Sequence, residues 1–369
     1  MRIIHVVRGH YNPNSLNGVY KVIDSISRVL HSFGHDVCVL SVSNESQDLF
    51  QSTEYRIYRV KEGALRLMIT NGFKNFIDRQ DKDTVYHFHS VFIPWFLPAM
   101  KYIRKHGCRC IILTPHGQYI NAAMDKSLKK RLCFRLFDSK VIQLADAIHL
   151  IGATEINKYI KANNESICLI PNGCDIARQI SDSSIIQRKL IFGYLGRLNI
   201  KQKGLDILLK AFALYRKNGG CGILAFGGDG QDKQILVRMA EEEGISNFVH
   251  FSGVLFDDKK WQFLESLAFF LHPSNWDVIP TACMEAASCN VPLVISKYTN
   301  LGEYVERFYA GWVIENDVKI LANKLMEAEN TYYNKASYMK ICRGASNMIT
   351  EELNWQQITK RILNELYSR

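Results

Sequence analysis

Short apolar, β-branched runs alternate with longer amphipathic stretches along the chain. The segment 2–8 predicts a buried strand, and apolar residues at three- and four-residue spacing from Val19 to Phe33 predict a helix that ends at Gly34. Further strands are predicted at 36–42, 55–60, 84–88, 109–114, 147–151 and 166–170. Strands that alternate with helices favour parallel pairing through crossover connections, so the first half predicts a doubly wound α/β sheet.

The alternation stops once and then restarts. The stretch 175–188 is polar and aperiodic, which predicts a linker. Strands are then predicted at 190–195, 222–226, 248–251, 268–272, 292–296 and 311–314, with helices at 205–215 and 231–243. We therefore expect two Rossmann-like domains, 1–174 and 189–350, facing each other across a cleft at the ends of their sheets, where such folds bind ligands.

Composition changes this picture only in the choice of partners. The 369 residues are 47% hydrophobic and 22% charged, which is ordinary for a globular protein. The formal net charge of +10 favours anionic partners, namely nucleic acid, a membrane surface or phosphorylated substrates. Ten cysteines without a C-x-x-C pair fit a reducing compartment, and neither a spanning segment nor a signal-peptide core is predicted. A cytoplasmic location is expected.

Three motifs could carry chemistry, and the first two are glycine turns after predicted strands. In the segment 196–204, Arg197, Lys203 and the N–H groups of the next helix could converge on phosphate, although a solvated turn is an equal alternative. Gly228 and Gly230 stand in a second turn that is no dinucleotide fingerprint, since Lys233 occupies the place of its last glycine. A tight turn that needs glycine remains open for this motif.

The third motif, 272–287, follows another predicted strand. Pro280 suits the first turn of a helix, Asp277 stands just before it, and Glu285 lies about one and a half turns inside. Two carboxylates on either side of a helix N-terminus suit a polyhydroxyl ligand whose phosphate docks on the amides between them. The alternative is that Asp277 only caps the helix and that Glu285 is solvated.

In this order the three motifs resemble the carboxyl-terminal half of glycosyltransferase family 4, whose members are retaining enzymes of the GT-B fold. The matching residues are Gly196-Arg197-Leu198 with Lys203-Gly204, Gly228-Asp229-Gly230, Pro273-Ser274, Glu285-Ala286, Pro292-Leu293-Val294 and 300–303. The amino-terminal half is similar more weakly, through 17–19, 114–117 and 170–175. The resemblance also implies that the helix predicted near 351–367 returns to the first domain, which would then comprise 1–174 and 351–369.

The resemblance implies a role for each site residue. Arg197 and Lys203 would bind the donor diphosphate, Asp277 the donor sugar, and Glu285 the ribose, while His116 would line the reacting sugar. The expected donor contacts are Gly18, Gly228, Gly230, Val254, Ile279, Pro280, Thr281 and Glu285, and His116, Asp277, Arg197 and Lys203 form the expected catalytic set. Two residues depart from the family: Asp277 replaces the usual glutamate, and Asn290 stands where glycine is common.

No metal or other cofactor is expected. Preorganised cations and helix amides can stabilise the negative charge that builds on a departing diphosphate. The only D-x-D tripeptide, 81–83, lies in a charged loop before a strand. His87 and His89 share one strand face, but without a third ligand in the pattern, packing is the favoured interpretation.

The segment 125–140 bears on the acceptor. It holds six basic and two acidic residues, and Leu128, Leu132, Leu136 and Val141 recur near helical spacing. A basic amphipathic helix could lie on anionic lipid, and a core-facing helix with a charged outer side is an equal alternative. Gln118, Tyr119, Lys129, Lys130 and Arg131 are the expected acceptor or membrane residues.

These features predict a retaining, metal-independent glycosyltransferase that moves a sugar from a nucleotide-diphosphate donor. Its expected acceptor is a lipid-linked saccharide in surface-polysaccharide assembly, at the inner face of the cytoplasmic membrane. The alternatives are a GT-B enzyme with a soluble acceptor, a nucleotide-sugar epimerase, and a non-catalytic nucleotide-sugar-binding protein. Nucleic acid is not expected, since no aromatic-interleaved basic strand is present.

Overall fold

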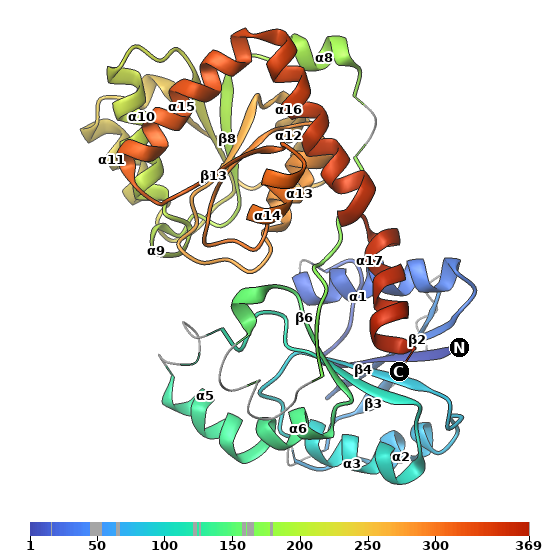
Figure 1. Cartoon of the computed structure of the whole chain (residues 1–369). Coiled ribbons are helices and arrows are strands. Elements are labelled where there is room, and N and C mark those ends of the chain that lie inside the picture. The colour runs from blue at the N-terminus through green and yellow to red at the C-terminus, as the bar shows by residue number, and fades with distance from the viewer. Residues whose placement is uncertain are drawn as a thin grey trace. The chain divides into compact units, whose positions relative to one another are not determined.

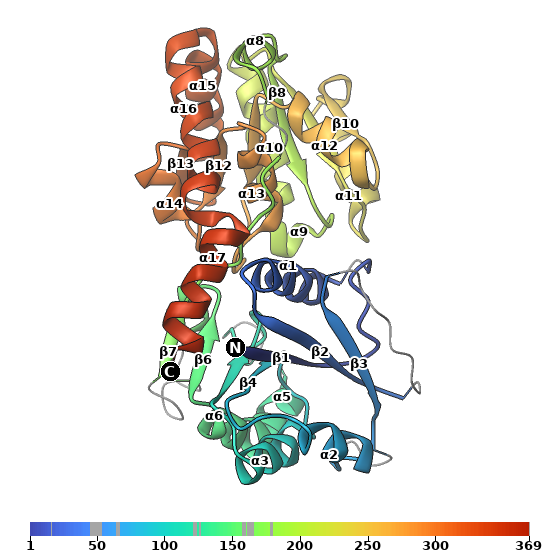
Figure 2. The same cartoon turned by 90° about the vertical axis from the view of Figure 1, so that its right-hand side faces the viewer.

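The structure of the protein is a computed structural model that describes residues 1–15, 17–44, 54–63, 67–120, 124, 127–156, 160, 166–177 and 180–368. The chain divides into two compact units, each with its own parallel sheet (Figure 1, Figure 2). The amino-terminal unit comprises Met1–Gly173 and Trp355–Arg369, and the carboxyl-terminal unit comprises Cys174–Asn354.

The amino-terminal unit is built on a seven-stranded parallel sheet in the order β3-β2-β1-β4-β5-β6-β7. Its strands are β1 (Arg2–Arg8), β2 (Asp36–Ser43), β3 (Arg56–Lys61), β4 (Val85–His89), β5 (Cys110–Thr114), β6 (Ala147–Leu150) and β7 (Ile167–Leu169). Helices α1 (Gly18–Ser32) and α17 (Trp355–Ile362) cover one face, and α2 (Asn71–Ile77), α3 (Phe96–His106) and α6 (Ser139–Leu144) cover the other (Figure 1). Because helices cover both faces, the central strands β1, β4 and β5 are buried along almost their whole length.

The carboxyl-terminal unit has a six-stranded parallel sheet in the order β10-β9-β8-β11-β12-β13. Its strands are β8 (Ile191–Leu195), β9 (Ile223–Gly227), β10 (Val249–Phe251), β11 (Phe269–His272), β12 (Leu293–Ser296) and β13 (Gly311–Ile314). The main helices are α10 (Leu205–Lys217), α11 (Lys233–Glu242), α12 (Asp257–Ser266), α13 (Thr281–Ser288), α14 (Gly302–Arg307), α15 (Val318–Tyr333) and α16 (Lys335–Asn347). The strand order reverses between β8 and β11.

The stretch 175–188 is not a plain linker, and that prediction was wrong. Ser181 caps a short helix, α8 (Asp182–Ile186), whose Ile185 is buried. The buried guanidinium of Arg188 donates hydrogen bonds to the carbonyls of Glu265, Cys289 and Asn290 at 2.9, 2.6 and 2.8 Å. A helix of five residues is too short to show a hydrophobic period, so the pattern could not reveal it.

The helix predicted near 351–367 is interrupted at Asn354, whose backbone is extended. A π-helical segment (Met348–Leu353) precedes it, and α17 starts at Trp355. The Asn354 amide donates to the carbonyls of Ile349 and Thr350, which closes the first segment. Residues 351–353 therefore belong to the carboxyl-terminal unit, and only Trp355 onward packs with the amino-terminal sheet, where the Tyr367 side chain is buried.

No helix in the described part of the chain is both long enough and apolar enough to cross a bilayer.

Candidate active site

The reversal of strand order in the carboxyl-terminal unit brings two of the sequence motifs together. β8 and β11 are hydrogen-bonded neighbours, and the loops 196–204 and 273–280 follow their carboxyl ends. The Ser274 hydroxyl and the Asn275 N–H both donate to the Gln202 carbonyl, at 3.0 and 2.8 Å, which joins the loops directly. Open α/β sheets bind ligands outside such a reversal point, so this edge is the candidate site.

The two glycine-rich loops interlock. Leu198 N–H donates to the Asp229 carbonyl at 2.9 Å, and Asp232 accepts from Ile200 N–H at 2.8 Å. A Cβ on Gly228 would overlap the Gly196 carbonyl oxygen, and one on Gly230 would overlap that of Leu198. Gly228 and Gly230 thus shape the loop that carries the exposed Arg197 side chain, which favours the tight-turn interpretation for these two residues.

Gly228→Ala is expected to destabilise the carboxyl-terminal unit by more than the backbone strain of a positive φ alone. Gly228 has φ +121°, and its Cβ would meet backbone that cannot rotate away. The matched control is Gly244→Ala, because Gly244 has φ +70° and no atom within 4 Å of a Cβ, so only strain of about 1–2 kcal/mol applies. Urea midpoints would show the larger loss at Gly228, and equal losses would contradict the close approach.

A carboxylate, an ammonium and an imidazole meet at the reversal point. Asp277 accepts a hydrogen bond from the Lys203 ammonium and lies 3.0 Å from His272 Nε2 through the same oxygen. Burial alone would raise the pKa of Asp277, but the bond from His272 and the charge of Lys203 outweigh it and lower that pKa to about 2. Burial lowers the pKa of His272. The structure therefore brings Lys203, which was predicted to bind the diphosphate, into direct contact with Asp277, which was predicted to bind the sugar.

Glu285 lies on α13 as predicted, but it is not free. Lys260 on α12 forms an ion pair with it at 2.8 Å. Thr281 is exposed at the first residue of α13, whereas Ile279 and Pro280 are buried beneath it. Val254, on the loop after β10, has 52% of its surface exposed. Thr281, Glu285 and Val254 can therefore reach a ligand by their side chains, while Ile279 and Pro280 can offer only backbone groups.

In the amino-terminal unit, Gly18 is the first residue of α1 and is exposed. The Asn17 side chain accepts from the N–H groups of Val19 and Tyr20 at 2.9 and 3.4 Å. A Cβ at Gly18 would meet no atom within 4 Å. The beginning of this 15-residue helix therefore leaves room beside Gly18 for an anionic group.

His116 follows β5 in a strained turn. Its φ is +53°, a conformation that residues other than glycine adopt rarely. The next N–H, of Gly117, donates to Glu155 at 2.6 Å, and the other carboxylate oxygen of Glu155 accepts from Ile151 N–H at 2.8 Å. Burial raises the pKa of Glu155 to about 7 against the opposing effect of these bonds. Such strain, held by a buried carboxylate, is typical of functional loops.

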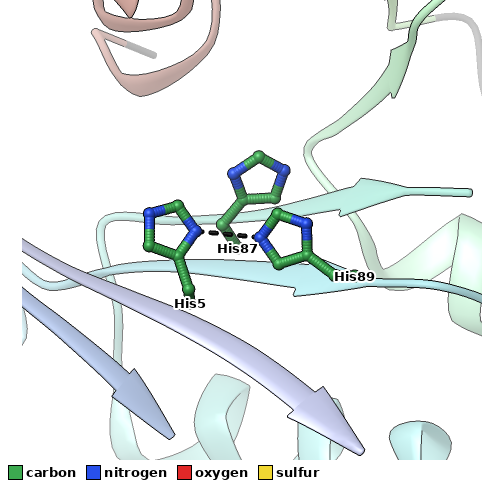
Figure 3. Close-up of side chains that lie close together, drawn as sticks. All are labelled: His5, His87 and His89. Atoms are coloured by element: carbon green, nitrogen blue, oxygen red, sulfur yellow. Dashed lines mark hydrogen bonds between the residues drawn. The ribbon is translucent and has the colours of Figure 1, made fainter. Parts of the chain in front are cut away.

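His87 and His89 on β4 have a third imidazole beside them, His5 on β1, which the spacing in the sequence did not reveal (Figure 3). A ring nitrogen of each lies within 4.8 Å of the others. His5 Nδ1 is 2.8 Å from His89 Nε2, shorter than the about 3.3 Å that a tetrahedral zinc ion imposes. Both nitrogens of His87 are engaged, with the hydroxyls of Tyr367 and Thr114 at 2.6 Å. His5 and His89 are therefore hydrogen-bonded to each other, while His87 stacks on His89 and makes its own hydrogen bonds elsewhere.

Tyr119 is fully buried, so its predicted contact with an acceptor was wrong. Its ring packs edge-on against Phe92 and Phe134, and burial, with the nearby Asp138 carboxylate adding to the effect, raises the pKa of its hydroxyl well above the usual value. Burial raises the pKa of Asp138 to about 6. Tyr119 therefore anchors the loop after His116 to the basic helix, and Gln118, which is half-exposed, is the neighbour that can reach solvent.

The basic helix turns a mixed face to solvent. It comprises α5 (Leu128–Cys133), a π-helical segment (Phe134–Asp138) and α6. Leu128, Leu132 and Leu136 are 74%, 57% and 49% exposed, so they do not face the core as the alternative interpretation required. Lys129 and Arg131 are exposed beside them, whereas the Lys130 ammonium lies 5.3 Å from the Phe92 ring centroid. Lys130 is therefore a packing residue as much as a surface charge.

Sequence reasoning missed His272, Lys260, Glu155 and His5. His272 contacts Asp277 and Lys260 contacts Glu285, and the motifs did identify both of these carboxylates. His272 itself lies inside the third motif. Glu155 and His5 lie in segments without any motif, and their partners are distant in sequence. The only sequence signal for the histidine cluster was the alternate placing of His87 and His89.

Two family models match the chain, one in each half. The model described as Glycosyltransferase Family 4 matches residues 16–178, and the one described as Glycosyl transferases group 1 matches residues 175–341. Their order agrees with the order of the two Rossmann-like sheets. The two Rossmann-like parallel sheets confirm the predicted GT-B fold class, and each half of the chain matches the model of a glycosyltransferase family.

The particular relatives are distant. The amylovoran biosynthesis glycosyltransferase AmsK of Erwinia amylovora is 26% identical over 176 residues, which cover 46% of this chain and 42% of that protein. A glycogen synthase of Mycobacterium tuberculosis is 22% identical over 402 residues, which cover 97% of this chain and 92% of that protein. Anabaena HepE in complex with UDP has a TM-score of 0.74 at 16% identity, with both chains covered completely. The match to AmsK spans less than half of that protein.

Proposed function

We propose that the protein is a retaining, metal-independent glycosyltransferase that uses a nucleotide-diphosphate sugar. The observation that carries the proposal is the contact of Lys203 with Asp277 at the reversal point, because Lys203 shares its loop with the exposed Arg197 and Asp277 shortly precedes α13. Two cations and a helix N-terminus suit a diphosphate, and the adjacent carboxylates suit sugar hydroxyls. The binding of UDP by HepE, which has the same fold, supports a nucleotide donor.

The proposed reaction breaks the bond between the anomeric carbon and the diphosphate oxygen, which keeps the electron pair. Arg197 and Lys203 stabilise the charge that develops on that oxygen. The acceptor hydroxyl bonds to the anomeric carbon from the face that the diphosphate leaves, and its proton passes to the departing diphosphate. The configuration is thereby retained, and the charges come from side chains without a metal ion. His116 lines the reacting sugar in this proposal.

A panel of nucleotide sugars and of their free nucleotide diphosphates tests donor binding. The correct donor is expected to raise the melting temperature selectively, since a ligand stabilises the state that binds it. Arg197→Ala should weaken nucleotide-diphosphate affinity by roughly 10- to 100-fold, because a charge-assisted hydrogen bond contributes about 1.5–3 kcal/mol. Unchanged affinity by calorimetry would remove Arg197 from the site. EDTA should leave transfer unchanged.

For the acceptor we propose a lipid-linked saccharide at an anionic membrane surface, in the assembly of a surface polysaccharide. The exposed leucines and flanking cations of the basic helix support this, and so does the likeness to a biosynthesis enzyme for amylovoran. The likeness to a glycogen synthase over 97% of the chain favours a second candidate, a soluble glucan acceptor. Transfer to a water-soluble oligosaccharide in a lipid-free assay would favour the second candidate.

Binding of the basic helix to an anionic membrane can be tested separately. Lys129→Gln with Arg131→Gln should weaken binding to vesicles of anionic lipid by roughly 30-fold, at about 1 kcal/mol for each basic residue. Leu132→Ser should weaken it further, because the leucine loses its place among acyl chains. The matched control is Lys82→Gln with Lys105→Gln, which removes two exposed cations elsewhere in the same unit. Equal effects of the two pairs in co-sedimentation would show that net charge alone acts and would contradict a specific surface.

A further inference from the structure

Three imidazoles form a continuous line through the amino-terminal sheet to His116. His5 Nδ1 lies 2.8 Å from His89 Nε2, and His89 Nδ1 lies 3.0 Å from His116 Nε2. The first two come from the neighbouring strands β1 and β4, and His116 follows β5, the next strand. His5 and His89 are fully buried, whereas His116 is partly exposed. The line therefore runs from the core to the surface of the unit.

A second chain of hydrogen bonds lies beside this line, and its partners determine which ring nitrogens of His87 and His149 carry protons. His149 Nε2 must donate to the Ile170 carbonyl at 2.9 Å, so His149 Nδ1 accepts from the Thr114 hydroxyl at 2.9 Å. The Thr114 oxygen then accepts from His87 Nε2, and His87 Nδ1 accepts from the Tyr367 hydroxyl. Every ring nitrogen in this chain is satisfied with neutral imidazoles. His87 and His149 thus have no proton or lone pair left for His5 or His89.

In the line from His5 to His116, the buried end at His5 determines which nitrogens donate and which accept. His5 Nε2 is buried and has no hydrogen-bond partner among the residues that the structure describes. If His5 Nδ1 accepted the hydrogen bond, Nε2 would carry a buried N–H without an acceptor, and folded proteins pair the large majority of such buried side-chain donors. If His5 Nδ1 donates instead, His89 Nε2 accepts and His89 Nδ1 donates. His116 Nε2 then accepts, and the proton of His116 sits on Nδ1.

We propose that His5 and His89 are positioning residues that hold His116 as the neutral Nδ1–H tautomer. The order of protons is His5 Nδ1–H to His89 Nε2, then His89 Nδ1–H to His116 Nε2. The partly exposed His116 ring therefore presents its Nδ1–H as a donor to an oxygen atom of the ligand. The ligand is a sugar hydroxyl or phosphate oxygen of the donor, and this assignment rests on the proposed function. The tautomer itself does not.

The surroundings keep the line neutral. Burial lowers the pKa of His5 and of His116 to about 3, and it lowers that of His89 well below the usual value, with the neighbouring imidazoles adding to the effect. The imidazoles of His5, His87 and His116 pack against His89, and His149, which packs against His87, also acts on it by its charge. A neutral imidazole carries a proton on only one of its two ring nitrogens, so one nitrogen donates a hydrogen bond and the other accepts one. Fixing the proton of one ring therefore fixes the proton of the next ring in the line.

The test is nitrogen-15 NMR of the histidine rings in the full-length protein, which distinguishes the two tautomers without substrate. The expected result is the Nδ1–H form at His116 in the wild type, unchanged from pH 6 to 8. His89→Phe keeps a ring but removes both bonds, so His116 should lose its fixed tautomer. His87→Phe is the matched control, because it is equally buried and lies outside the line. A Nε2–H form of His116 in the wild type would overturn the proposal.

Variants of His5 separate positioning from packing. His5→Asn can still donate from near the Nδ1 position and should keep the tautomer of His116, whereas His5→Phe should lose it. Once the donor is known, His89→Phe should lower kcat roughly fivefold with little change in the KM for acceptor, in line with one hydrogen bond of about 1 kcal/mol. Equal tautomers in His5→Asn and His5→Phe would contradict the order of protons.

Zinc addition distinguishes the line from a metal site. The histidine signals should stay unchanged with one equivalent of zinc chloride, and coordination shifts at His5 and His89 would overturn the proposal. A protein that shows the expected tautomer but transfers no sugar would refute the proposed function and leave the line intact. A protein that transfers sugar with His116 in the other tautomer would do the reverse.

Discussion

Lys203→Met is expected to lower the rate of sugar transfer by roughly 10²- to 10³-fold, the usual cost of removing one preorganised group that stabilises developing charge. Asp277 and the short helix that Asn199 caps hold the Lys203 ammonium in place before any donor arrives. The ammonium therefore needs little rearrangement to meet a diphosphate. Methionine keeps most of the length and apolar bulk of the side chain, so the change removes charge more than packing.

The control for this variant lies two residues away. Lys201 is on the same short helix, is exposed and contacts neither Asp277 nor His272. Lys201→Met changes the net charge equally and should leave kcat within about twofold, since isolated surface charges contribute little. Equal losses in the two variants would show that the overall field, and not one placed cation, acts on the donor. A wild-type rate in Lys203→Met would refute the proposed chemistry of this site.

Most of the fold was predictable because it depends on local patterns. In the sheets, strands such as Arg2–Arg8 and Gly311–Ile314 are runs of apolar residues bounded by polar turns, and their predicted ends agree with the structure to within a residue or two. The errors have a common cause, namely local features too short for a hydrophobic period to repeat. The five-residue helix α8 and the single extended residue Asn354 are both of this kind.

The candidate site was predictable where function and backbone constraint coincide. Gly228 and Gly230 leave a trace in the sequence because only glycine fits against the carbonyls of Gly196 and Leu198. Tyr119 shows the opposite case. Its position beside His116 suggested a ligand contact, but its ring turns to the core, and residue order does not determine which way a side chain points after a turn.

The histidine line could not be read from the sequence because its members are far apart in the chain. His5 and His89 are 84 residues apart and meet only because β1 pairs with β4. The two-residue spacing of His87 and His89 correctly placed both rings on one face of a strand. It did not show that one ring belongs to the line toward His116 and the other to the chain that ends on Tyr367. That distinction depends on tertiary hydrogen bonds.

Asp277→Asn should reduce both transfer and stability, with the stability effect confined to a defined pH range. The Lys203 ammonium and His272 Nε2 both contact one oxygen of the carboxylate, so the amide oxygen of asparagine can still accept from both, but the negative charge that pairs with Lys203 is lost. Transfer should fall by roughly 10- to 100-fold, the effect of one charge-assisted bond of about 1.5–3 kcal/mol. Asp277→Glu restores the charge and should recover stability before it recovers the rate, because its carboxylate lies one methylene further out.

The sign of the pH effect follows from the pKa of Asp277, which is about 2 in the folded protein and 3.8 as the reference. A lowered pKa means that the ionised form stabilises the fold, by about 2 kcal/mol at neutral pH. This contribution is complete above about pH 4 and disappears as the pH falls toward 2. Urea unfolding at pH 7 and pH 5 should therefore show the full difference in unfolding free energy between wild type and Asp277→Asn, and at pH 3 the difference should be smaller.

The exposed Asp175 offers the control, since Asp175→Asn should change stability little at any of these pH values. A difference that stayed constant down to pH 3 would mean that Asp277 stabilises the loop by its shape and not by its charge.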